Sequence, residues 1–133
     1  MGRWGVLFLA ALMASSACAG RSDEEQVRAV TREWLSAFVD GDWERVCRLS
    51  TERFRSGLAT AAAPRASCEE GMANAFRLPE PTRRQLRENW EFRASSLTVD
   101  GDQATVRLEE TPLPEGNQEI TLRREQSEWR VGG

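Results

Sequence analysis

The spacing of the apolar residues changes once along this chain, and this change constrains the fold more than any other feature. Between residues 22 and 58 apolar side chains recur every three or four positions, as on one face of a helix. From Trp90 onward they recur every two positions, as on one face of a strand. Helices followed by strands predict an α+β domain, cone-shaped, with N-terminal helices packed on a curved antiparallel sheet of about four strands.

Two serines mark the predicted helix starts. Ser22 and Ser67 each stand three residues before a glutamate, which is the spacing of a capping box. The first helix is expected to end at Gly41, where glycine can adopt the left-handed conformation, and a second, shorter helix follows. The helix that starts at Ser67 should run to about Phe76. After a rigid proline break, one more helical turn is predicted over residues 82–89.

The second half of the chain predicts an antiparallel meander. Asp100 and Gly101 form the best hairpin turn in the sequence. The apolar parity changes near Ser95 and Ser96, which predicts a β-bulge there. The side chains expected on the outer face of the sheet are polar or charged, namely Thr105, Arg107, Glu109, Thr121 and Arg123. Such a face favours exposure to solvent over a dry dimer interface.

The N-terminus has the composition of a secretory leader. Residues 1–17 contain an early arginine, then an apolar run too short to span a bilayer, then small residues. Cys18 follows Ala17 and resembles the acceptor cysteine of a bacterial lipoprotein, which is acylated before the leader is cut in front of it. Residues 18–21 would then be a short tether and residues 22–133 the folded domain. The alternative is ordinary cleavage after Ala17 or Ala19, which would release a secreted protein.

The cysteine count supports this interpretation. If Cys18 carries a lipid, Cys47 and Cys68 remain as an even set in an oxidising compartment. Because Cys68 is predicted at a helix start beside a loop, a bridge back to Cys47 is geometrically easy, and we predict this disulfide. The alternative is two independent buried thiols. The chain has no histidine, so two thiols fall short of a zinc shell and no metal is expected.

Residues 22–133 resemble the nuclear transport factor 2-like superfamily, the cone fold shared with polyketide-cyclase-like and ketosteroid-isomerase-like proteins. The resemblance lies in residues 38–43 (FVDGDW), 97–106 (LTVDGDQATV) and 128–131 (EWRV). More narrowly, the chain is similar to small bacterial envelope lipoproteins of this fold, which often place one cysteine in the second helix and one after the following loop. The resemblance implies the cone fold and little about activity, because this fold hosts enzymes, binders and assembly modules.

The first functional hypothesis is a membrane-anchored, extracytoplasmic binding or protein-interaction domain. The net charge of −3 gives no indication of nucleic-acid binding, and no cofactor is expected. A short tether would keep the domain and its partner at the membrane. The candidate pocket for a small apolar ligand is formed by aromatic residues, although core packing is the favoured explanation for the tryptophans. These residues are Trp34, Phe38, Trp90, Phe92 and Trp129.

The second hypothesis is a small enzyme that uses a buried carboxylate as a general base. The groups that could be nominated are Asp40, Glu91, Glu109 and Arg107, and their positions favour turns and solvent-facing strands. The chain lacks the tyrosine and histidine that would stabilise an oxyanion, so no catalytic residue is assigned. A third hypothesis is a structural oligomerisation module. The arginines Arg83, Arg84 and Arg87 are expected on a solvated helix face, with contact to lipid phosphates as the alternative.

Overall fold

The computed structural model describes residues 22–62 and 66–132. The predicted signal peptide, Cys18 and the tether lie outside these residues. Helices come first in the chain: α1 (Asp23–Asp40), α2 (Trp43–Arg48), α3 (Glu52–Ala62), α4 (Cys68–Ala75) and α5 (Glu80–Asn89). Four strands follow: β1 (Ala94–Asp100), β2 (Gln103–Leu108), β3 (Glu119–Glu125) and β4 (Glu128–Val131). A 3-10 turn, Pro114–Gly116, interrupts the connection between β2 and β3.

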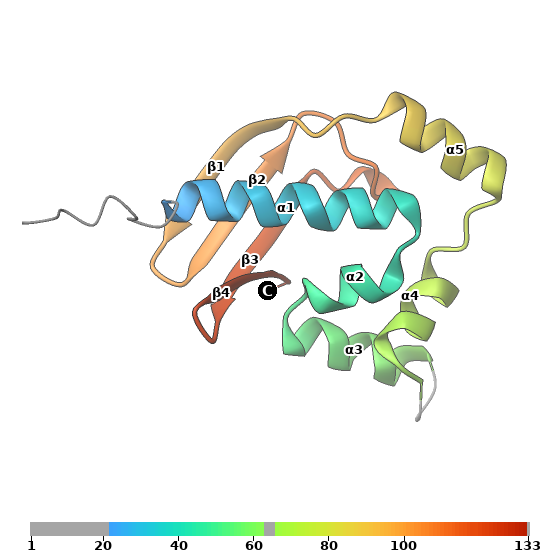
Figure 1. Cartoon of the computed structure of the whole chain (residues 1–133), viewed down its shortest axis with the longest axis horizontal. Coiled ribbons are helices and arrows are strands. Elements are labelled where there is room, and N and C mark those ends of the chain that lie inside the picture. Colours follow the sequence, from blue (N-terminus) through green and yellow to red (C-terminus); the bar gives the residue numbers. More distant parts are fainter. Residues whose placement is uncertain (1–21, 63–65, 133) are drawn as a thin grey trace, which may run out of the picture.

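The strands form one sheet in the order β1-β2-β3-β4, and every neighbouring pair is antiparallel. Helix α1 lies across one face of this sheet, where it contacts β1, β2 and β4 (Figure 1). Helices α2, α3 and α4 cluster beside it, and α5 lies at the far end of the molecule (Figure 1). The prediction of an α+β domain with helices on a four-stranded antiparallel sheet is confirmed.

The core lies between α1 and the sheet. Helix α1 buries one continuous stripe, including Val27, Leu35 and Phe38, because these positions fall on the same side of the helix. The sheet presents Val106, Leu122 and other alternate residues of β2, β3 and β4 to this stripe. On the opposite face of the sheet the predicted outward residues are exposed, apart from the half-buried Thr105.

The hairpin and bulge predictions for β1 and β2 are confirmed. Asp100 pairs with Gln103, which leaves a two-residue turn whose first residue, Gly101, has a positive φ of 58°. The β1–β2 register shifts between Ala94 and Ser96, so one extra residue lies in β1. This extra residue explains why the apolar parity of the sequence changes at this point.

Both predicted capping serines act as caps. The Ser22 hydroxyl accepts a hydrogen bond from the Glu25 amide at 3.3 Å, and the Ser67 hydroxyl accepts one from the Glu70 amide at 3.2 Å. Helix α1 ends at Gly41 in the left-handed conformation, as expected.

The last helix begins two residues before its predicted start at residue 82. Helix α5 begins at Glu80 and not at Thr82, so Pro81 lies inside the first helical turn. A proline is tolerated there because the amides of the first turn have no acceptor within the helix.

The prediction that Arg83 is solvated is also wrong. Its side chain is buried, with 9% of the residue exposed, whereas Arg84 and Arg87 are exposed. The Arg83 Nη1 donates to the carbonyl oxygens of Phe38 and Val39, both at 3.0 Å. Both carbonyls lie in the last turn of α1, and that of Phe38 also accepts a hydrogen bond from the Gly41 amide at 3.1 Å. The Arg83 guanidinium therefore adds charged donors at this helix end and joins α5 to α1.

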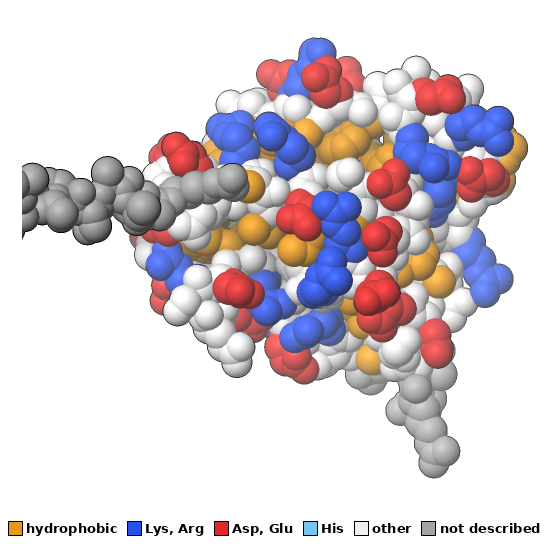
Figure 2. Space-filling view, viewed as in Figure 1, with side chains coloured by type: hydrophobic (Ala, Val, Ile, Leu, Met, Phe, Trp, Pro, Cys, Tyr) orange, Lys and Arg blue, Asp and Glu red, His pale blue; other side chains and the backbone are white. Residues whose placement is uncertain are grey.

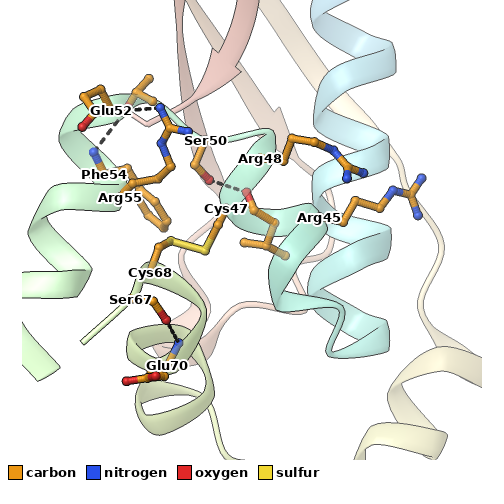
Figure 3. The surroundings of a disulfide bond; sticks show 12 residues. Arg45, Cys47, Arg48, Ser50, Glu52, Phe54, Arg55, Ser67, Cys68 and Glu70 are labelled. Atoms are coloured by element: carbon orange, nitrogen blue, oxygen red, sulfur yellow. Dashed lines mark hydrogen bonds and ion pairs between the residues drawn. A yellow bond between two sulfur atoms is a disulfide. The ribbon is translucent and has the colours of Figure 1, made fainter. Parts of the chain in front are cut away.

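The predicted disulfide between Cys47 and Cys68 is present, with a Cα–Cα distance of 6.1 Å. It joins α2 to the first residue of α4, beside the cap formed by Ser67 (Figure 3). Because the bond lies at the start of α4, it holds that helix against the rest of the helical cluster. In the described part of the chain no helix is both long enough and apolar enough to cross a membrane.

Candidate functional site

Two adjoining hollows open where α4, α5 and the β2–β3 connection meet. One has a volume of about 510 Å³ and lies against α5, and we call it the α5 hollow. The other has a volume of about 570 Å³ and lies against β3 and β4, and we call it the sheet hollow. Both are lined by Phe38, Ala75, Phe76 and Pro114, so together they form one groove. Each volume falls within the range of roughly 300–1,000 Å³ that ligand pockets occupy.

Aromatic rings form the shared floor of this groove. Phe38 is 1% exposed and stacks on Trp34, with ring centroids 5.7 Å apart. The half-buried Phe76 meets the edge of Phe38 at 5.1 Å. The Trp34 Nε1 donates to the Ser50 hydroxyl at 2.9 Å, and that hydroxyl in turn donates to the Val46 carbonyl. This network holds the indole in one orientation, so the floor is preformed.

The α5 hollow has one polar wall. Thr82, Gln85, Leu86 and Asn89 line it at spacings of three and four residues, which is one face of helix α5. The opposite side is apolar, with Pro112, Pro114 and Leu78, an exposed leucine. Within the described residues the structure gives the side chains of Thr82, Gln85 and Asn89 no hydrogen-bond partner. These neutral groups are therefore available to a ligand.

One charged residue lines each hollow. Arg77 is the one charged residue among those that line the α5 hollow, and it donates to the Asn74 side-chain oxygen at 2.7 Å. Glu119 is the one charged residue among those that line the sheet hollow. Its amide donates to the Asn117 side chain at 3.2 Å, which fixes the loop at the start of β3. The lining of each hollow therefore includes one charged residue, a cation in the α5 hollow and a carboxylate in the sheet hollow.

Two of the five aromatic residues predicted for a pocket line this groove, and three do not. Trp34 and Phe38 form its floor. Trp90 donates its Nε1 to the Glu110 carbonyl, Phe92 packs beneath the Arg32 guanidinium, and Trp129 packs beneath that of Arg124. These three aromatic residues lie outside both hollows.

Sequence reasoning missed Phe76 and the polar wall of α5. The spacing of Thr82, Gln85 and Asn89 was a usable signal, because it places three uncharged polar groups on one helix face in an otherwise charged segment.

The groups nominated for catalysis, Asp40, Glu91, Glu109 and Arg107, are all exposed and line neither hollow. Glu91 accepts a hydrogen bond from Arg93 at 3.0 Å, and this bond, together with the charge of Glu91, raises the pKa of Arg93. Among the described residues no cluster of three or more acidic, cysteine or histidine side chains could hold a metal ion. Arginine and acidic side chains are intermixed over the face that carries α1 (Figure 2).

Comparison of the chain with protein-family models, with curated proteins and with solved structures gives no significant match.

Proposed function

We propose that this chain is a lipid-anchored, extracytoplasmic binding domain without catalytic activity, and that the groove is its binding site. The observation that carries the proposal is the preformed aromatic floor shared by the two hollows. An apolar surface that is concave, open to solvent and edged by a few polar groups is the usual form of a ligand site. The exposed positions of the four catalytic candidates favour binding over catalysis.

The anchor is proposed from the sequence. Acylation of Cys18 would leave Ala19, Gly20 and Arg21 before the cap of α1 at Ser22. Three extended residues reach at most about 10 Å, so the domain would lie against the membrane surface. Helices packed on an antiparallel sheet also agree with the proposed relationship to the nuclear transport factor 2-like superfamily.

Filling the groove tests the proposal. Ala75 is exposed at the end of α4 and lines both hollows, so Ala75→Phe should obstruct the groove without disturbing the core. Glu88→Phe adds the same ring at an exposed position of α5 outside the groove and is the matched control. We expect the wild type and the control to increase the emission of 8-anilinonaphthalene-1-sulfonate, an anionic dye whose aromatic rings bind apolar surfaces. The Ala75→Phe variant should lose most of this increase.

The control must unfold at the same urea concentration as the groove variant for this comparison to hold. Equal dye binding by all three proteins would place the apolar site elsewhere, and the groove would have to be given up as the binding site.

A further inference from the structure

The polar wall of the α5 hollow carries two side-chain amides in register with each other. Gln85 and Asn89 are four residues apart on one helix, so they are separated by about 6 Å along its axis. Each amide offers both a donor and an acceptor. Within the described residues, neither side chain has a hydrogen-bond partner, and both border the hollow. The wall therefore presents a repeating pair of donor and acceptor groups.

An extended peptide backbone has a matching repeat. In an extended chain every second residue directs its N–H and C=O to the same edge, and two residues advance it by about 6.6 Å. This distance is close to the separation of Gln85 and Asn89 along α5. Each amide could then satisfy both backbone groups of one peptide residue, while the side chain of the next residue enters the apolar part of the hollow beside Leu78 and Pro112.

An acyl chain fits this wall poorly. A hydrocarbon offers no hydrogen bond, so the amides of Gln85 and Asn89 would lose water without gaining a partner. The charge in the hollow further limits the class of ligand that fits. Arg77 is exposed and has no ion pair within the described part of the chain, so it complements a carboxylate on the ligand. The chemistry of the hollow therefore favours a peptide with apolar side chains and an acidic residue at one end.

We infer that the α5 hollow binds an extended segment of a partner protein, held by its backbone on Gln85 and Asn89 and by an acidic residue on Arg77. This inference rests on the proposed function, because it names the ligand class of the same groove. It adds the orientation of the ligand, which runs along α5 with one backbone edge toward the helix.

The test uses fluorescence anisotropy of a labelled, capped peptide of alternating valine and threonine that ends in aspartate. Two analogues are N-methylated, one at the valines and the other at the threonines. Because alternate N–H groups point to opposite edges, we expect only one analogue to bind about fivefold or more weakly than the parent peptide. Replacing the aspartate by asparagine should weaken binding in the wild type and have little effect in Arg77→Gln.

Protein variants complete the test. Gln85→Leu and Asn89→Leu should each weaken binding of the parent peptide by about fivefold, because one amide is lost. Glu88→Leu changes an exposed residue of α5 outside the groove and should bind as the wild type does. Leucine is a good helix former, so α5 should persist in all three variants.

Three results would each contradict a different part of these proposals. If a fluorescent dodecanoate binds while the peptide does not, and Gln85→Leu tightens that binding, the peptide inference is wrong although the groove remains a binding site. If both N-methylated analogues bind equally weakly, the proposed orientation of the peptide along α5 is wrong. If neither peptide nor dodecanoate binds, the proposed function fails together with this inference.

Discussion

Arg83 contributes to stability and to the binding site through the same side chain. Its guanidinium donates to two carbonyls at the end of α1 and, through Nη2, to the Phe76 carbonyl at 3.4 Å. It also packs over the Trp43 ring, 5.2 Å from the centroid. These contacts hold α5 against the end of α1 and beside Phe76. They therefore position the helix that forms one side of the α5 hollow.

We expect Arg83→Met to lower the free energy of unfolding by about 2–3 kcal/mol, because the methionine keeps some packing while the buried carbonyls lose a charged donor. Urea unfolding followed by tryptophan fluorescence measures this loss. The matched control is Arg84→Met, which changes the exposed neighbour and should alter stability by no more than about 0.5 kcal/mol. Similar losses in both variants would show that the bridge from Arg83 to α1 contributes nothing of its own.

The role of Arg83 could not be predicted from its neighbours in the sequence. Arg83, Arg84 and Arg87 read as one charged helix face, and nothing local distinguishes the first of them. Its burial depends on the end of α1, more than forty residues earlier in the chain. The pairing of Cys47 with Cys68 was easier to predict, because the number of cysteines and the compartment expected from the leader limit the alternatives.

Among the elements, α4 depends most on a single covalent link. It supplies Met72 and Ala75 to the groove, and its first residue carries the disulfide to α2. Its other contacts are with the short helices α2 and α3. The disulfide therefore stabilises the wall of the groove as well as the domain.

Replacing both cysteines, Cys47→Ala with Cys68→Ala, should lower the free energy of unfolding by about 3 kcal/mol, given the 21-residue separation. Hydrogen exchange should accelerate in α4 more than in α1, because α1 keeps its packing on the sheet. Dye binding in the groove should fall in parallel.

Reduction of the wild-type protein provides the control, since it breaks the same bond without changing a residue. Unchanged exchange in α4 after either treatment would contradict a role for the disulfide in holding the groove wall.

Element boundaries were predictable where the signal is local. The serine caps of α1 and α4 and the turn at Gly101 each depend on a few adjacent residues, and all three agree with the sequence reading. The start of α5 was missed because a proline reads as a break although it also fits the first turn of a helix. The bulge in β1 was predictable from the parity of apolar residues alone.

At the scale of the whole molecule, the groove results from segments that are far apart in sequence. Its walls come from α1, α3, α4, α5, β3, β4 and the β2–β3 connection, and no single segment carries a recognisable pattern for it. Trp34 and Phe38 could be predicted because they lie on the apolar stripe of α1. Phe76 and Pro114 could not, since their proximity depends on how the helices pack.

The central claim is that an anchored domain holds a ligand in this groove, and the native intact mass of the protein extracted gently from its host's membranes tests it most directly. We expect an acylated chain that begins at Cys18, lacks the two thiol hydrogens removed by the disulfide, and carries extra mass from a retained ligand. Glu88→Phe should keep this extra mass and Ala75→Phe should lose it. A protein that is absent from the membrane fraction, or one whose retained mass is the same in both variants, would contradict the account.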